Sequence, residues 1–505
     1  MHWLKLALLA LLVTAFSLPS AAQSVSSGSI SGTVLDPQAA VVPGADVTLT
    51  NVERNVSFKN TTDAAGNFVF TQLLPANYSL TVEAAGFKKF EQRNVILNLN
   101  DRLSVGRITL EVGPIFQTVE VTSEGLRLQT ESAERAATIV GTQLENIQVN
   151  GRSPLSLLRA IPGVVTNQDT SLATNQIQDI YINGARGTSL NATLDGVSNL
   201  DTGSNTKFFA TVSLESLQEF KVLASNYQAQ YGKAAGGTIM MVTKSGGKDF
   251  HGSAYTYYRD KGLTANTWTR NRDVAPDPAT GKAPRSDYHY NYFGYTVGGP
   301  VYIPGKFNTN KDKLFFFWSE EYQRQKIQGG LVRLSVPTAL ERQGDFSQSV
   351  DKNAAYGGTP NAQYIRDPLS ADRVCSASHT AGCFQDGGVI GKIPASRINT
   401  PGLALLKMFP LPNVTGQKGY NYQWTPVAAN PRHEQLIRAD YNLSSRWRVI
   451  SSLTRLVQDV ERGDYVGKTW TYSLNPNFPL PGGAQYDHPG YVLSLIHISE
   501  PTRPY

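Results

Sequence analysis

Cysteine is scarce in this sequence of 505 residues, and long apolar runs are missing after its first residues. The two cysteines are Cys375 and Cys383, and two thiols alone cannot complete a tetrahedral zinc site. In an exported chain, a pair this close together in a polar stretch favours a disulfide. Because no later segment reaches about 18 consecutive apolar residues, no membrane-spanning helix is expected. Insertion into a membrane would therefore require a closed β-barrel.

Residues that could carry catalysis are also few. Residues 23–247 contain no histidine and no cysteine, so they offer neither a zinc ligand of those types nor an imidazole base. The chain lacks a phosphate-binding loop, an H-E-x-x-H pair and a nucleophile elbow. Residues 195–201 lack the carboxylate spacing of a calcium loop, which favours a plain Asp-Gly turn there. We therefore expect no enzyme, no cofactor and no metal site.

The balance of residue types indicates a folded chain of several domains. Hydrophobic residues make up 40% and charged residues 17%, and 44 glycines with 27 prolines stay below the level of disordered or collagen-like chains. At roughly 150 residues per domain, the length predicts about three units. The formal net charge is +6, but no compact basic patch accompanies it, which argues against a nucleic-acid partner.

Residues 1–22 have the layout of a secretory signal peptide. Lys5 precedes an apolar run at residues 6–18, and small residues end at Ala22, just before Gln23. An uncleaved membrane anchor is the alternative, but the run is shorter than the roughly 20 residues of a membrane helix. We expect cleavage between Ala22 and Gln23 and export of the remainder.

Residues 28–112 predict a β-sandwich, because short β-rich runs alternate with turn signals and show no helical periodicity. The runs are residues 29–35, 45–51, 56–62, 67–70, 78–84, 95–99 and 105–110. The phrases at residues 32–36, 43–47, 63–68 and 84–87 resemble the carboxypeptidase-regulatory-like domain, a transthyretin-like sandwich of the carbohydrate-binding-like fold class. The resemblance implies a module rather than a peptidase. Carbohydrate is one candidate ligand, although no exposed aromatic pair argues for it.

A second unit covers residues 125–247, after a linker at 113–124. Helices are expected at 132–144 and 155–160. Strands are expected at 180–182 and 192–194, each followed by an Asn-Gly or Asp-Gly turn. The phrases at residues 157–164, 182–187, 194–197, 216–222 and 236–246 resemble the plug of a TonB-dependent outer-membrane receptor. They resemble most closely the Oar-like branch, which carries an N-terminal sandwich.

In that family a short extended segment before the plug, the TonB box, recruits the protein TonB by β-strand addition. The residues that match its position before the plug and its alternation of polar and apolar residues are Gln117, Thr118, Val119, Glu120 and Val121. A run this short also fits one more strand or a solvated linker. The resemblance therefore implies a TonB-box-like segment at these positions.

Aromatic residues concentrate after residue 247, where 19 of 23 tyrosines and 5 of 6 tryptophans lie. Such residues are typical of barrel strands that end at membrane interfaces. In the clearest candidate strand, Ile437 and Tyr441 alternate with Arg438 and Asp440, giving one face for lipid and one for a watery lumen. The other candidates are residues 250–260, 293–298, 314–324 and 447–457. A half-buried strand of a soluble protein would show the same alternation.

Residues 248–494 are accordingly predicted to form part of a transmembrane β-barrel. Five strands cannot close a plugged barrel, which needs about 22, and an open sheet edge in lipid leaves amides unpaired. We therefore expect a piece of a longer protein. Residues 495–505 resemble translated sequencing-adapter DNA and carry two prolines where a closing strand needs donors, so we expect them to be non-native.

Together these features predict a mainly β protein: a sandwich, an α+β plug and the first strands of a barrel. The resemblance implies an outer-membrane location, with the N-terminal unit in the periplasm and membrane lipid around the barrel. It also implies uptake of an unidentified extracellular substrate, with TonB pulling on residues 117–121 to displace the plug. The alternative is a surface-exposed structural or adhesive barrel that transports nothing.

Overall fold

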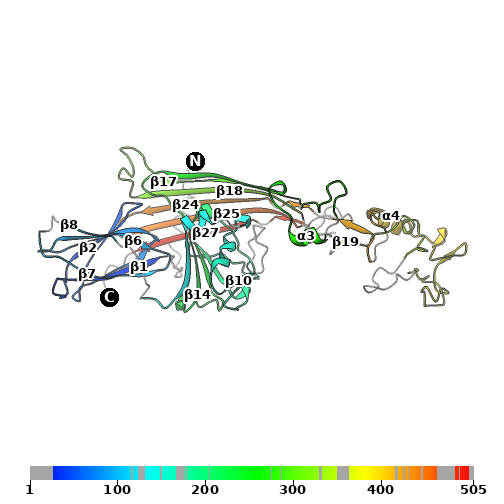
Figure 1. Ribbon diagram of the computed structural model, residues 1–505, viewed down its shortest axis with the longest axis horizontal. Helices are drawn as coiled ribbons and strands as arrows, with labels where there is room; N and C mark the ends of the chain where they lie inside the picture. The colour runs from blue at the N-terminus through cyan, green and yellow to red at the C-terminus, as the bar shows by residue number, and fades with distance from the viewer. Residues whose placement is uncertain are drawn as a thin grey trace, which may run out of the picture.

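The computed structural model of the chain is elongated, with β-strands running along most of its length (Figure 1). It describes residues 27–114, 118–122, 131–147, 150–166, 177, 179–203, 205–273, 276–285, 287–328, 332–349, 363–415, 419–424, 427–429, 431–444, 447–462, 484–487 and 489–499. Three parts follow one another in sequence: a sandwich, a middle unit at residues 131–247, and a long sheet with its connecting loops at residues 251–499.

The sandwich consists of two sheets that pack face to face. One has the strand order β4-β1-β7 and the other the order β3-β2-β5-β6-β8. The strands are β1 Gly28–Leu35, β2 Asp46–Asn51, β3 Val56–Thr61, β4 Asn67–Leu73, β5 Ala76–Glu83, β6 Lys89–Leu97, β7 Arg102–Thr109 and β8 Thr118–Thr122. Every second side chain of β5 is buried, which is the period expected of a strand with one face in a core. All seven expected runs fall on strands, although β6 begins at Lys89 rather than at residue 95.

The middle unit is built on a five-stranded sheet in the order β13-β12-β15-β14-β9. Its strands are β9 Arg135–Val140, β10 Val164–Thr166, β11 Ile180–Ile182, β12 Asn191–Leu194, β13 Val197–Ser198, β14 Leu217–Ser225 and β15 Thr238–Thr243. Its helices are α2 Gly141–Asn146, η1 Asn150–Arg152, η2 Pro154–Ala160, η3 Gly187–Ser189, η4 Leu214–Ser216 and η5 Ala229–Tyr231. A cluster of buried aliphatic and aromatic side chains, including Leu158, Phe220 and Ile239, joins these elements.

The helix expected at residues 132–144 is wrong over most of its length. Residues 135–140 form β9, which pairs antiparallel with β14, and the short helix α2 follows it. Thr138, Ile139 and Val140 are β-branched, and such residues favour a pleated sheet position over a helical one. The expected helix at 155–160 is the 3-10 helix η2.

The two expected turns in this unit are confirmed. Asn183 and Gly184 have φ values of 50° and 79°, and Asp195 and Gly196 have values of 47° and 79°. Two successive positive φ values are the requirement of the tight hairpin turn that Asn-Gly and Asp-Gly favour. The second turn joins β12 to β13 as a hairpin and fixes the backbone of Asp195.

The long sheet contains all five strands expected after residue 247. Its order is β16-β17-β18-β24-β25-β26, with β23 paired to β18 and β27 paired to β25. The strands are β16 His251–Asp260, β17 Tyr288–Pro300, β18 Leu314–Gln328, β23 Val427–Ala429, β24 Arg432–Asn442, β25 Trp447–Arg462, β26 Ala484–Asp487 and β27 Gly490–Ser499. That residues 495–505 are non-native stays a prediction. Residues 495–499 belong to β27 and pair with β25, but this pairing does not show where they come from.

A loop region extends beyond one end of the long sheet, at the end of the molecule far from the sandwich (Figure 1). It contains η6 Lys261–Leu263, α3 Trp268–Asp273, β19 Val332–Leu334, η7 Glu341–Gln343, β20 Gln385–Asp386, β21 Val389–Ile390, η8 Ala395–Arg397, α4 Thr400–Met408 and β22 Tyr422–Trp424. Cys375 and Cys383 form a disulfide there, with their Cα atoms 4.9 Å apart. In the part of the chain that the structure describes, no helix is long and apolar enough to span a membrane.

Candidate functional site: the contacts around the middle unit

The long sheet buries many charged side chains on its covered face, beside apolar ones such as Phe315 and Leu436, and it exposes large apolar side chains on its other face. In β24 the side chains of Arg438 and Asp440 are buried, whereas that of Ile437 is 53% exposed. In β18 the buried residues include Glu321, while Trp318 is 41% exposed. Water-soluble sheets do the reverse, because burial of apolar area is what stabilises them. A sheet with this arrangement suits an apolar solvent on its outer face.

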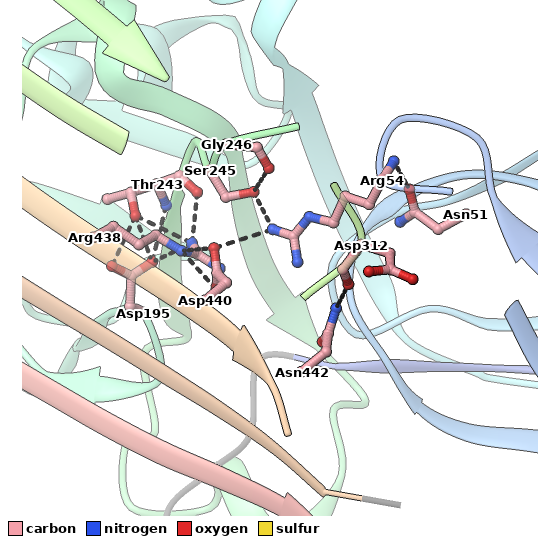
Figure 2. A network of polar contacts seen from close by, with 10 residues as sticks. All are labelled: Asn51, Arg54, Asp195, Thr243, Ser245, Gly246, Asp312, Arg438, Asp440 and Asn442. Carbon is pink, nitrogen blue, oxygen red and sulfur yellow. Dashed lines mark hydrogen bonds and ion pairs between the residues drawn. The ribbon is translucent and has the colours of Figure 1, made fainter. Parts of the chain in front are cut away.

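A network of charges joins the buried face of the sheet to the middle unit (Figure 2). The Asp195 carboxylate accepts hydrogen bonds from the Thr243 amide at 2.9 Å and from the Ser452 hydroxyl at 2.7 Å. Arg438 donates to the Thr243 carbonyl at 2.7 Å and pairs with Asp440 at 3.1 Å and with Asp195 at 3.5 Å. These bonds join the β12–β13 turn and β15 of the middle unit to β24 and β25.

The sandwich contributes a further cation to this network. Arg54, which follows β2, pairs with Asp440 at 3.1 Å and donates to the hydroxyl of Ser245. Two arginines therefore face two aspartates in a buried setting, so the formal charges balance. Close by, a Cβ on Gly246 would lie 2.4 Å from the Phe316 carbonyl oxygen, so only glycine lets the chain pass this close to β18.

A second charged cluster joins the sandwich directly to the middle unit. The Lys221 ammonium donates to the Leu99 carbonyl at 2.6 Å and to the Asp101 carboxylate at 2.8 Å. The Leu99 amide donates to the Glu219 carboxylate at 2.6 Å. All four residues are buried, and Leu99 also packs in an apolar cluster with Leu223. We call Leu99, Asp101, Glu219 and Lys221 the docking cluster.

The position of the docking cluster follows from the two faces of β14. Phe220 and Val222 point into the core of the middle unit. Glu219 and Lys221 alternate with them and therefore point to the opposite face, toward the sandwich. Since both faces are covered, the two charged side chains are buried and each depends on a partner from the sandwich.

Burial, together with the nearby Asp101, raises the pKa of Glu219 to about 7, although the Leu99 amide and Lys221 act to lower it. A carboxyl whose pKa is higher when folded adds stability that is fully present below its unfolded pKa of 4.5 and is lost as the pH rises through about 7. We expect the free energy of unfolding of wild-type protein to fall by about 3 kcal/mol from pH 4.5 to pH 8 through this group. Urea titrations in detergent check this, with Glu219→Gln as the reference; equal pH dependence in both proteins would contradict it.

The segment predicted to be a TonB box lies on the sandwich. Residues 118–122 form β8, which pairs parallel with β6 from Lys89↔Thr118 to Arg93↔Thr122. Arg93 also pairs with Glu120 at 3.0 Å across the two strands. Since β8 is the last strand in the order of its sheet, no strand among the described residues of that sheet pairs with its second edge. Gln117, like the cleavage residues Ala22 and Gln23, lies outside the described residues.

Sequence reasoning missed the docking cluster and the charge network. It placed residues 216–222 in a family phrase without assigning contacts to Glu219 and Lys221, and it treated Asp195 as a turn residue alone. One signal was available: two charged residues interrupt the strand 217–225, which is otherwise largely apolar. Among the described residues, no group of three or more His, Cys, Asp or Glu side chains is arranged to hold a metal ion.

Family comparisons match each of the three parts. The carboxypeptidase regulatory-like domain matches residues 29–111, and the TonB-dependent receptor plug domain matches residues 129–238. The outer membrane beta barrel domain matches residues 242–502, which is more than half of the chain.

Among curated proteins, the chain is 28% identical over 318 residues to the TonB-dependent transporter Oar of Myxococcus xanthus, covering 60% of this chain and 27% of that protein. The chain thus spans about a quarter of the length of this relative. Among solved structures it is similar to the outer membrane transporter YddB of Escherichia coli, at 13% identity and a TM-score of 0.36, over 65% of this chain and 33% of that one. It is also similar to the siderophore receptor PirA of Acinetobacter baumannii, at 13% identity and a TM-score of 0.29, over 72% and 44%. The chain belongs to the outer membrane β-barrel family, and in it a carboxypeptidase regulatory-like domain precedes the plug domain of the TonB-dependent receptors.

Proposed function

We propose that this chain belongs to a TonB-dependent outer-membrane transporter whose plug is the middle unit. The observation that carries the proposal is β8, an edge strand at the predicted TonB-box position whose second edge pairs with no described strand of its own sheet. TonB would add a strand to that edge, since main-chain hydrogen bonds to an exposed strand are a general way to recruit an extended partner. The sandwich would then lie in the periplasm, where TonB can reach it.

The contacts between the middle unit and the long sheet support movement of the plug. They include many polar contacts, such as the bonds of Asp195 to Ser452 and of Arg432 to Thr211, the latter at 2.5 Å. Polar contacts can be exchanged for contacts with water at a lower net cost than apolar ones of the same extent, because water supplies donors and acceptors. A pull on the middle unit would therefore meet bonds that hydration can replace.

The proposal is tested by replacing Val119 with proline. Proline removes an amide donor and disfavours a strand interior, so we expect at least ten-fold weaker binding of the TonB C-terminal domain to purified full-length protein. Val119→Ile is the matched control, because it keeps every amide and a β-branched side chain. Deleting residues 117–121 should abolish binding. If TonB binds the Val119→Pro protein and the protein lacking residues 117–121 as tightly as wild-type protein, this segment is not the TonB site.

A second measurement separates transport from adhesion without knowledge of the substrate. Ser213 is buried between the middle unit and β18, with its hydroxyl 3.4 Å from that of Ser319. In cells, Ser213→Cys should react with a membrane-impermeant maleimide when TonB is present and should be protected when TonB is deleted. Equal protection in both strains would favour the alternative of a structural or adhesive barrel with a fixed plug.

A further inference from the structure

We propose that the sandwich itself transmits the pull of TonB from β8 to the middle unit, through β6 and the docking cluster. The inference rests on the proposed function, because it assumes that TonB engages β8. Along the chain, β8 is joined to the middle unit through residues 123–134. The folded contacts provide a second route, and this route reaches a different strand of the middle unit.

The first step of the route is the pairing of β8 with β6. Five pairs in continuous parallel register connect the two strands, and the Arg93–Glu120 ion pair crosses them. That ion pair is exposed and adds little by itself. A force directed along the strands loads the ladder bonds together rather than one after another, so β8 resists sliding from β6.

The second step is the strand β6, which links both contacts. Its first half, at Lys89 to Arg93, pairs with β8, and its end at Leu97 leads into the loop that carries Leu99 and Asp101. The loop is held in shape by the Asn98 side chain, whose Nδ2 donates to the Asp101 carboxylate at 3.1 Å. A displacement of β8 that carries β6 with it therefore displaces Leu99 and Asp101.

The third step is the docking cluster on β14. Lys221 donates hydrogen bonds to the Leu99 carbonyl and the Asp101 carboxylate of the loop, and Glu219 accepts one from the Leu99 amide. β14 pairs with β15 on one side and with β9 on the other, so it lies inside the sheet of the middle unit. The folded route delivers force to an interior strand, whereas the route along the chain first reaches the edge strand β9.

The sandwich also contacts the long sheet, which in the proposed function stays in place when the plug moves. Arg54 pairs with Asp440 of β24, and Arg448 of β25 donates to the Gln72 carbonyl at 2.9 Å. These contacts oppose a movement of the sandwich and must break before it. They therefore set a threshold force for displacement of the plug.

The test is single-molecule force spectroscopy on the full-length protein in a lipid bilayer, with the TonB C-terminal domain as the handle. A double variant, Glu91→Cys with Glu120→Cys, places a disulfide across paired positions of β6 and β8. Thr50→Cys with Ser57→Cys is the matched control, because it joins β2 to β3 away from the route. We expect wild-type protein and both oxidised variants to show the same first extension.

We call an additional extension that precedes the first extension, at lower force, an early release. An early release that wild-type protein shows and that the β6–β8 disulfide abolishes would overturn the inference. The added length would be at most roughly 40 Å, the fully extended reach of residues 123–134 at about 3.5 Å per residue. Asp101→Asn should lower the force of the first extension, whereas Arg102→Gln, at an exposed contact with Gln228, should not; no change with Asp101→Asn would also overturn it. Attachment with early release contradicts this inference alone, while failure of TonB to attach contradicts the proposed function and the inference with it.

Discussion

Replacing Arg438 with methionine is expected to lower the free energy of unfolding by about 3–5 kcal/mol, because it removes one cation from a buried, charge-balanced network. Asp195 and Asp440 would remain buried, with Arg54 left to balance both carboxylates. The Thr243 carbonyl would also lose a donor. Methionine keeps most of the side-chain volume, so loss of the charge, and not a cavity, would dominate the change.

Urea titration of the purified protein in detergent micelles measures this change. Arg324→Met is the matched control, since Arg324 lies exposed on the outer face of β18 and its loss should change the free energy of unfolding by less than about 0.5 kcal/mol. The network would have no stabilising role if Arg438→Met cost no more than this control. Adding Asp440→Asn to Arg438→Met should cost less than the sum of the single changes, because the two residues share an ion pair.

Replacing Lys221 with methionine is expected to be similarly damaging, at about 3–5 kcal/mol, but its effect should centre on the attachment of the sandwich. The change would leave Asp101 and Glu219 buried without the Lys221 ammonium, which pairs with Asp101 and acts to lower the pKa of Glu219. The Leu99 carbonyl would lose its donor as well. We expect the sandwich to separate from the middle unit before either part unfolds.

Hydrogen exchange at the Leu99 amide reports that separation. The amide is bonded to Glu219, so its exchange should accelerate about a hundred-fold or more in Lys221→Met. Lys244→Met is the control, because Lys244 pairs with Glu145 at a half-exposed site of the same unit. Exchange at Leu99 that is equal in the two variants would show that the docking cluster does not hold the sandwich in place.

The strands of the long sheet were predictable because alternation is a local property. From Ile437 to Tyr441, apolar and charged side chains alternate at every step, and the structure has β24 there. The turns at Asn183 and Asp195 were predictable for a similar reason, since a short polar residue followed by glycine accepts two positive φ values. Each of these features is decided by neighbours within a few residues.

The errors and omissions concern contacts between distant segments. Residues 135–140 were expected in a helix, but β14, some 80 residues later in the chain, pairs with them and makes them a strand. The partners of Glu219 and Lys221 lie about 120 residues away, at Leu99 and Asp101. No local pattern identifies such partners, because an isolated charge in a strand fits a solvated face as well as a buried pair.

By itself, the sequence determined the order of the three parts, the positions of most strands and turns, and the family that they resemble. Only the tertiary structure decided which face of the long sheet is covered, and that β8 completes the sandwich instead of crossing freely to the middle unit. The physical reason is that the same alternation of apolar and charged residues along a strand is compatible with either face packing against protein. Likewise, a short extended segment can pair with any open edge, so its place depends on which edge the folded chain brings to it.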